Sequence, residues 1–138
     1  MNEHVKVLIK LAEKSLEYND IPVGAIVIKD NKIIGKGYNN RYKNKIVTGH
    51  AEINAILSAE KKINDHRLND CILLSTLMPC PMCREVIKEA RISKVYYILS
   101  RPNSENIGLV NCKKLDSSEM ELVNKYKNEF LNFFKKMR

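Results

Sequence analysis

The stretch Cys71-Ile72-Leu73-Leu74-Ser75-Thr76-Leu77-Met78-Pro79-Cys80-Pro81-Met82-Cys83 says more about the fold than any other part of the sequence. Residues 71–76 form an apolar run of strand length, and Pro79 ends it. Pro81 suits the first turn of a helix, where the N–H that proline lacks is not needed. The stretch therefore predicts a strand, a turn and a helix, whose buried face carries Met82, Val86, Ile87 and Ala90.

The segments on either side continue this alternation of strands and helices. Towards the N-terminus, the patterns predict a helix from about residue 50 to 63, a polar loop over 39–48, an antiparallel hairpin and a first helix over 5–16. The two hairpin strands cover residues 23–29 and 33–38. Towards the C-terminus, we expect a strand over 94–99, a loop over 100–117 and a last helix opened by a capping box at Ser118 and Glu121. The apolar stripe of this last helix is Leu122, Tyr126, Phe130, Phe133, Phe134 and Met137.

This order of elements predicts an α/β fold. Strands that alternate with helices after a hairpin favour a three-layer α/β/α sandwich with a mixed central sheet. A chain of 138 residues and 15.9 kDa indicates one domain, over residues 1–138. No apolar run is long enough for a membrane span and no secretory leader opens the chain, so we expect a cytoplasmic protein without a membrane partner.

The chain is basic, with 24 Lys and Arg against 16 Asp and Glu and a net charge of +8. This balance favours a polyanionic partner, nucleic acid first, although a base-composition bias towards Lys, Asn and Ile explains it equally well. The densest cluster of basic residues, uninterrupted by an acid, is Lys36, Arg41, Lys43 and Lys45.

Two short segments carry the residues that point to chemistry: His50-Ala51-Glu52 and Pro79-Cys80-Pro81-Met82-Cys83. N–H dipoles at the start of the helix favour the thiolate forms of Cys80 and Cys83, and thiolates bind metals. Because His50 also begins a predicted helix, two helix N-termini would converge on one metal. Three protein ligands leave a fourth position for water, as in a catalytic zinc site.

Two other interpretations of the cysteine pair stay open. A structural zinc site would need a fourth ligand, for which the candidates are Cys71, Cys112, His4 and His66. A Cys-x-x-Cys pair in a cytosolic protein also occurs as a redox couple, which would make Cys80 and Cys83 a disulfide-forming pair.

Glu52 would lie beside the metal without binding it. A carboxylate there can take a proton from an activated water and pass it to a leaving nitrogen. By itself Glu52 would be read as a solvated first-turn glutamate stabilised by the helix dipole. Together with the cysteine pair it completes H-x-E followed by P-C-x-x-C, the known signature of zinc nucleobase deaminases, which favours the catalytic interpretation.

The chain resembles the cytidine deaminase-like superfamily of zinc deaminases, and within it most closely the bacterial tRNA-specific adenosine deaminases. The resemblance spans nearly the whole sequence. It implies that His50, Cys80 and Cys83 bind one Zn²⁺ per chain and that Glu52 shuttles the proton. The matching segments are Ile21-Pro22-Val23-Gly24-Ala25, Gly37-Tyr38-Asn39, Thr48-Gly49-His50-Ala51-Glu52, Pro79-Cys80-Pro81-Met82-Cys83 and Phe133-Phe134-Lys135-Lys136.

The same resemblance implies further properties. Asn39 would hydrogen-bond the substrate base or ribose, whereas its other interpretation is a simple turn residue before Asn40. The enzyme would be a hydrolase that converts adenosine to inosine at the wobble position of a tRNA anticodon loop. It would also bind RNA and form a homodimer, for which apolar residues of the third helix, Val86, Ile87 and Ala90, offer some support.

The sequence departs from the tRNA enzymes at two places. Met78 stands where they usually carry Glu, and Ser100-Arg101-Pro102-Asn103 replaces an acidic residue followed by a segment with Gly and Ser. Deaminases of free bases or nucleosides, with guanine or cytosine as substrate, share the catalytic signature and are the first alternative. The second alternative is a noncatalytic RNA-binding module that zinc stabilises.

Overall fold

The structure, a computed structural model, describes residues 2–101, 112–116 and 118–136. Its central sheet has the strand order β2-β1-β3-β4-β5. β1 pairs antiparallel with both β2 and β3, whereas β3, β4 and β5 run parallel, so the prediction of a mixed sheet is confirmed. The strands are β1 (Gly24–Lys29), β2 (Lys32–Tyr38), β3 (Ile72–Leu77), β4 (Lys94–Leu99) and β5 (Cys112–Lys114).

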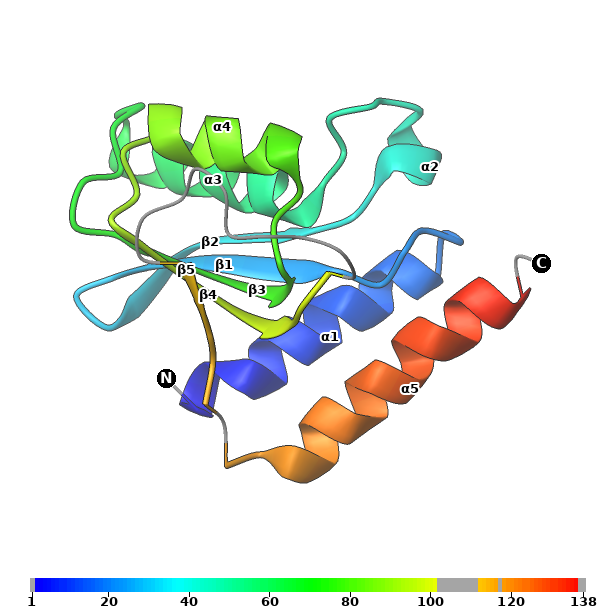
Figure 1. The fold of residues 1–138 in the computed structure, drawn as a ribbon. Helices are drawn as coiled ribbons and strands as arrows, with labels where there is room; N and C mark the ends of the chain where they lie inside the picture. Colours follow the sequence, from blue (N-terminus) through cyan, green and yellow to red (C-terminus); the bar gives the residue numbers. More distant parts are fainter. Residues whose placement is uncertain (1, 102–111, 117, 137–138) are drawn as a thin grey trace.

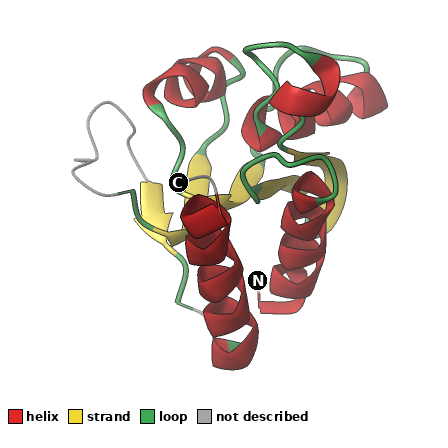
Figure 2. Cartoon of the chain, turned by 90° about the vertical axis from the view of Figure 1, so that its right-hand side faces the viewer, coloured by secondary structure: helices red, strands yellow, loops and turns green. Residues whose placement is uncertain are grey.

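Helices cover both faces of this sheet, as the three-layer prediction requires. α3 and α4 lie on one face, and α1 and α5 lie side by side on the other (Figures 1 and 2). The helices are α1 (Val5–Leu16), α2 (Arg41–Asn44), α3 (Ala51–Ile63), α4 (Pro81–Glu89) and α5 (Met120–Lys136), with a short 3-10 turn, η1 (Asn2–His4), before α1. None of the described helices combines the length and the hydropathy that crossing a bilayer requires.

The central strands are apolar on both sides because each side faces a helical layer. Ala25 and Val27 of β1 pack in the core under α3 and α4. Ile26 and Ile28, the alternate residues of the same strand, pack in the second core against α1 and α5. This alternation explains why β1 reads as an unbroken apolar run in the sequence.

Glycine brings α3 unusually close to β2. A Cβ atom at Gly37 would collide with the backbone of Ala51 and Ala55, so the helix backbone rests directly on the strand. Ala51 is the first residue of α3 and follows His50. The close packing at Gly37 therefore fixes where the first turn of α3, and with it His50, lies above the sheet.

Two short elements fall where the sequence predicted loop. α2 lies within residues 39–48, where the carboxylate of Asp20 accepts hydrogen bonds from the backbone N–H groups of Tyr42 and Lys43. β5 lies within residues 100–117 and pairs with β4, Cys112 opposite Val95. Both elements depend on contacts with distant residues, which local patterns do not encode.

The start of the last helix differs slightly from its predicted position, and some predicted features lie outside the described residues. α5 begins at Met120, one residue later than a capping box at Ser118 would place it. Met137, the last residue of the expected apolar stripe, and Pro102 and Asn103, part of the departure from the tRNA enzymes, lie outside the described residues.

Candidate active site

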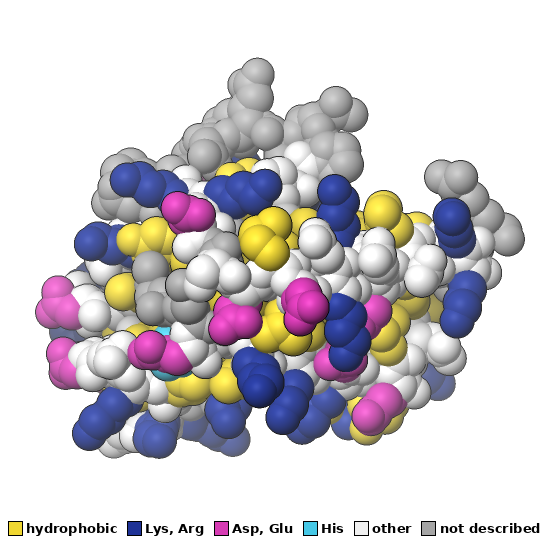
Figure 3. All heavy atoms as spheres, turned by 90° about the horizontal axis from the view of Figure 1, so that it is seen from below, with side chains coloured by type: hydrophobic (Ala, Val, Ile, Leu, Met, Phe, Trp, Pro, Cys, Tyr) yellow, Lys and Arg dark blue, Asp and Glu magenta, His cyan; other side chains and the backbone are white. Residues whose placement is uncertain are grey.

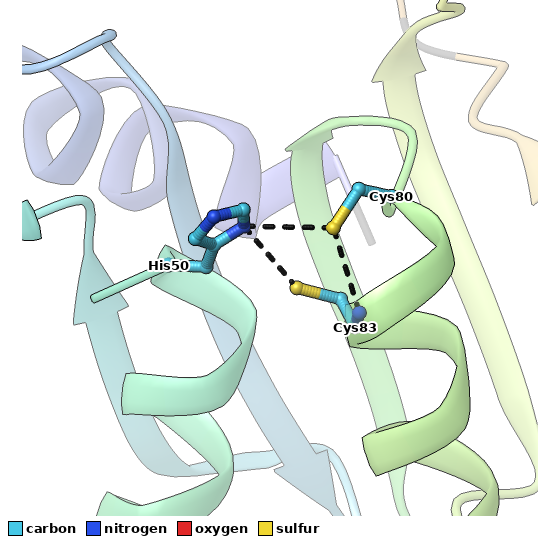
Figure 4. A group of neighbouring side chains, drawn as sticks. All are labelled: His50, Cys80 and Cys83. Atoms are coloured by element: carbon cyan, nitrogen blue, oxygen red, sulfur yellow. Dashed lines mark hydrogen bonds between the residues drawn. The ribbon is translucent and has the colours of Figure 1, made fainter. Parts of the chain in front are cut away.

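His50, Cys80 and Cys83 meet at one point above the end of the sheet. The Nδ1 atom of His50 lies 3.6 Å from Sγ of Cys80 and 3.5 Å from Sγ of Cys83 (Figure 4). The three candidate ligand atoms all lie within 4.8 Å of one another. Tetrahedral zinc with ordinary Zn–S and Zn–N bonds separates sulfur from nitrogen by about 3.6 Å, so the three residues fit such an ion.

Two helix N-termini hold these side chains in place. His50 is the N-cap residue of α3 and Cys80 is the N-cap residue of α4, both with extended backbone. Pro81 occupies the first turn of α4, and the backbone N–H of Cys83 points at Sγ of Cys80 from 3.5 Å. The positive ends of both helices therefore face the cysteine sulfurs and stabilise negative charge on them.

The two thiols differ sharply in acidity. Hydrogen bonding from Cys83, followed by that from His50, lowers the pKa of the Cys80 thiol to about 3, although partial burial opposes the shift. The same hydrogen bond, with burial and the nearby Glu52, raises the pKa of Cys83. Without a metal the pair thus holds one proton between two sulfurs, and a divalent cation is the partner that would displace it.

Glu52 is buried beside this cluster, with 2% of its surface exposed. Burial raises the pKa of its carboxyl, and the charge of Cys80 adds to the shift, whereas His50 and Arg101 oppose it. A solvated first-turn glutamate would be exposed, so the structure rules out that interpretation. A carboxyl with a raised pKa is suited to accepting and returning a proton.

Asn39 is also buried, and its side chain joins β2 to α3. Its Oδ1 accepts a hydrogen bond of 2.8 Å from the backbone N–H of Ala51. The backbone N–H of Asn39 donates to the carbonyl of Val23. The oxygen of the amide is therefore used within the protein. The Nδ2 amide group is the hydrogen-bond donor that this side chain can offer to a substrate.

A cavity of about 600 Å³ opens beside Asn39. Its walls come from three places: the segment before β1, the loop that contains α2, and the end of α5. Apolar and aromatic side chains dominate, with two cations at the rim. The residues that matter below are Ile21, Arg41, Tyr42, Lys45, Phe133 and Phe134.

The basic cluster predicted from the sequence lies in this region. Lys36, Arg41, Lys43 and Lys45 are all exposed, and Arg41 and Lys45 line the cavity. Lys43 lies over the ring of Tyr18, with its Nζ 4.3 Å from the ring centre. By contrast, acidic and basic side chains are interspersed on the face seen from below (Figure 3).

Two arginines whose contacts the sequence did not reveal support the turn before Cys80: Arg84, and Arg101, known so far only as a departure from the tRNA enzymes. The buried Arg84 donates from Nε to the carbonyl of Pro79 at 3.1 Å and from a terminal nitrogen to the sulfur of Met78 at 3.6 Å. Arg101 donates to the carbonyl of Met78 at 2.6 Å. Arg84 lies three residues before the buried Ile87, so its position on the inner face of α4 was the signal available in the sequence.

Three further residues support the surroundings of the site, and only Tyr126 gave a signal in the sequence, through its place in the apolar stripe of the last helix. Asp20 caps α2, as described above. Asn54 of α3 donates from Nδ2 to the carbonyl of Tyr38 and to Oδ1 of Asn40, both at 2.9 Å, and so fixes the segment around Asn39. Tyr126 of α5 is fully buried and donates a hydrogen bond to the carbonyl of Pro22.

The structure argues against a structural zinc site with four protein ligands. Among the described residues, no His, Cys, Asp or Glu other than His50, Cys80 and Cys83 joins the metal-binding group, so Cys71, Cys112, His4 and His66 do not supply a fourth ligand. Cys80 and Cys83 form no disulfide in the structure, and a reduced pair is compatible with the redox interpretation, which therefore stays a prediction. The arrangement is that of three protein ligands with an open position rather than a closed structural site.

Comparison with known proteins agrees with this geometry. Residues 1–99 match the model of the cytidine and deoxycytidylate deaminase zinc-binding region. The chain is 34% identical to the tRNA-specific adenosine deaminase of Aquifex aeolicus, over 97% of this chain and 93% of that protein. It is 39% identical to the guanine deaminase of Bacillus subtilis, over 63% of this chain and 56% of that protein.

Coverage differs widely among the relatives. The chain spans 18% of the tRNA(Ile)-lysidine synthase of Deinococcus radiodurans, to which it is 37% identical, and about half of the tRNA-specific adenosine deaminases of Streptococcus pyogenes. A structure solved in a study of A-to-I editing by tRNA:A34 deaminases superposes with a TM-score of 0.76 at 25% identity, over 82% of this chain and 97% of that one.

The matched region contains both halves of the metal-binding group and the buried glutamate, in the fold of solved deaminases. The chain therefore belongs to the cytidine and deoxycytidylate deaminase zinc-binding family.

Proposed function

We propose that this chain is a hydrolytic deaminase that holds one Zn²⁺ with His50, Cys80 and Cys83 and uses Glu52 as its proton shuttle. The observation that carries the proposal is a buried carboxyl beside a three-ligand cluster. When bound, zinc would supply an activated water for attack on the amino-bearing ring carbon. Glu52 would accept the proton of that water and return it to the departing amine.

The chain's own residues would orient the reacting base. Asn39 would donate from Nδ2 to the base or the ribose, because its oxygen is engaged by Ala51. Arg84 and Arg101 would keep the turn before Cys80 rigid through the carbonyls of Pro79 and Met78. A rigid turn holds the sulfur of Cys80 at the distance from His50 that metal binding requires.

Metal analysis combined with Glu52→Ala tests this mechanism. We expect one zinc per chain in both proteins, and a loss of activity of about 10²- to 10⁴-fold in the variant, since a general acid–base group contributes that much. Ala12→Ser, at a buried position of α1 far from the cluster in sequence, controls for nonspecific effects of a buried change. Activity retained in Glu52→Ala would refute the assigned role.

We further propose that the substrate is adenosine at the wobble position of a tRNA anticodon loop. The relative of which this chain covers 93%, that of Aquifex aeolicus, is a tRNA-specific adenosine deaminase. The cavity beside Asn39 supports the proposal, because aromatic side chains such as Tyr42 and Phe134 can stack on unpaired bases while Arg41 and Lys45 attract phosphates. A loop base is already partly unstacked, which lowers the cost of placing it in a pocket.

Guanine is the competing substrate, because a guanine deaminase is also among the relatives. A side-by-side assay of an anticodon stem-loop RNA, adenine, cytosine and guanine at two salt concentrations separates the two. Turnover of the stem-loop should fall steeply as salt rises, because phosphate contacts release counterions. Rapid turnover of a free base with an inert stem-loop would refute the tRNA assignment and leave the zinc mechanism intact. Tight RNA binding without ammonia release from any substrate would instead favour the noncatalytic module.

A homodimer and a cytoplasmic location complete the proposal. The sequence offered Val86, Ile87 and Ala90 for a dimer contact, but Ile87 and Ala90 are buried in the core of the chain. Of these three residues of α4, only Val86, half-buried, is available for contacts. Leu57 of α3, 54% exposed, lines a cavity of about 250 Å³ together with Val86 and supports a contact between copies here. Light scattering that gives a monomer of about 16 kDa would contradict the dimer. Cys71, Cys80 and Cys83 form no disulfide in the structure, which fits a reducing compartment.

A further inference from the structure

The hydroxyl of Tyr126 joins α5 to the segment that precedes β1. The side chain is fully buried, and Oη donates a hydrogen bond of 2.7 Å to the carbonyl of Pro22, 104 residues away in sequence. Thr76 at the end of β3 also hydrogen-bonds this hydroxyl, and its Oγ1 accepts from the backbone N–H of Gly24 at 3.0 Å. Burial, which raises the pKa of Tyr126, keeps the phenol neutral and able to donate.

From Pro22 the connection continues to the residues around the metal cluster. The next carbonyl, that of Val23, accepts the backbone N–H of Asn39 at 3.1 Å. The side chain of Asn39 in turn accepts the N–H of Ala51, the first residue of α3. The position of residues 22–23 therefore sets the position of Asn39 relative to the N-terminus of α3, where His50 and Glu52 lie.

A row of aromatic rings on α5 connects Tyr126 with the cavity. Phe130 lies four residues after Tyr126, and Phe134 four residues after Phe130, so all three share one side of α5. The ring centres of Tyr126 and Phe130 are 6.2 Å apart, and those of Phe130 and Phe134 are 5.0 Å apart. Phe134 and its neighbour Phe133 form the wall of the cavity that α5 supplies.

The opposite walls of that cavity belong to the segment that Tyr126 holds. Ile21, next to Pro22, lines the cavity, and so does Asp20, whose carboxylate fixes α2 through the N–H groups of Tyr42 and Lys43. One hydroxyl thus fastens α5 to the segment on the far side of the cavity. Its loss would let the two sides separate without touching the metal ligands.

We propose that Tyr126 is a positioning residue for substrate binding: its hydroxyl sets the width of the cavity beside Asn39 and thereby the affinity for the RNA loop. This inference rests on the proposed tRNA substrate and deepens it. We expect the effect in substrate binding, because the hydroxyl bonds the carbonyl of Pro22 and joins two walls of the cavity, and it bonds none of the proposed metal ligands, although the charge of Glu52 acts on it.

Steady-state kinetics of Tyr126→Phe with an anticodon stem-loop test the proposal. We expect KM to rise about five- to tenfold, as for the loss of one buried hydrogen bond, with kcat within about twofold and one zinc per chain. Tyr97→Phe, which removes the same hydroxyl from another buried tyrosine, on β4, should leave KM unchanged. Hydrogen exchange of the Asn39 N–H should become faster in Tyr126→Phe than in Tyr97→Phe.

Each outcome decides one question. A wild-type protein that does not deaminate the stem-loop refutes the proposed substrate, whatever Tyr126→Phe does. A wild-type protein that is active, with an unchanged KM in a folded Tyr126→Phe, overturns the positioning role. Should Tyr126→Phe fail to fold, Phe130→Leu interrupts the row of rings and keeps the hydroxyl. KM should then rise in that variant, and an unchanged KM there would also overturn the inference.

Discussion

At the scale of single residues, the protonation of the cysteine pair favours the binding of a cation. Cys80 is a thiolate at neutral pH because its pKa is about 3, while Cys83, with a raised pKa, keeps its proton. When the free zinc concentration is about 1,000 times the dissociation constant, zinc binding stabilises the folded state by about 4 kcal/mol. Removing zinc with a chelator should therefore lower Tm by about 10 °C, measured by thermal melting. In Cys83→Ser, which lacks one of the proposed ligands, the chelator should change Tm far less; an equal shift would contradict the proposed site.

Asn39 has two roles that substitution can separate. Its Oδ1 satisfies the N–H of Ala51, and its Nδ2 is the proposed donor to substrate. Asn39→Ala removes both groups and should cost about 1–2 kcal/mol of stability, as other lost helix caps do. Asn39→Asp keeps the acceptor, so Tm should stay near the wild-type value while KM rises about tenfold for want of the donor. Denaturation and kinetics together check this pair, and an unchanged KM in Asn39→Asp would argue against contact with substrate.

At the scale of elements, the packing of α3 on β2 depends on a single missing methyl group. A Cβ at position 37 would meet the backbone of Ala51 and Ala55, which no side-chain rotation relieves. Gly37→Ala should destabilise the fold by about 2–3 kcal/mol, as overpacking does, and should weaken zinc binding because His50 moves with α3. Urea unfolding and zinc titration measure the two effects. Lys36→Ala, at the neighbouring exposed position, is the control that should change neither.

The elements also show what the sequence could and could not predict. α1, α3 and α4 and four strands follow from local apolar periodicity, and the two helix N-termini at His50 and Cys80 follow from the motifs. β5 could not be predicted, because Cys112-Lys113-Lys114 has no strand pattern of its own and its strand depends on pairing with β4. The same holds for α2, whose N–H groups are satisfied by Asp20, more than 20 residues earlier. Helix residues with buried polar contacts, such as Arg84 and Asn54, were hidden because their types usually indicate an exposed position.

At the scale of the whole molecule, α1 and α5 meet at a pair of acids. Glu129 of α5 has a raised pKa, first because it is partly buried and second because the charge of Glu13 on α1 repels its own. Lys125 lies 3.5 Å from Glu13 and 3.9 Å from Glu129 and offsets part of this repulsion. An acid with a raised pKa in the folded state lowers stability above that pKa, where it is charged, and has no such effect below the pKa of the unfolded chain, near 4.5.

This arrangement predicts how stability depends on pH. Glu129→Gln removes the charge and should raise Tm by a few degrees at pH 8, where the wild-type carboxyl is ionised. The gain should shrink as pH falls towards 4.5, because the wild-type carboxyl is then neutral too. Thermal melts of both proteins from pH 4.5 to 8 provide the measurement. A Tm difference that does not vary with pH would show that the acid pair carries no such penalty.

The lysines on the two edge strands of the sheet have a second consequence. β2 and β5 are the outermost strands in the sheet order, and both present exposed lysines: Lys32 and Lys36 on β2, Lys113 and Lys114 on β5. An outermost strand can recruit a strand of another molecule and begin aggregation, and lysine at that position opposes such pairing by charge repulsion. β5 is also only three residues long, and a bulge interrupts β2 where it pairs with Val27 and Ile28 of β1. The positive charge that favours an RNA partner therefore also opposes aggregation of the protein through its edge strands. Neutralising the lysines at the sheet edges should first reduce its solubility.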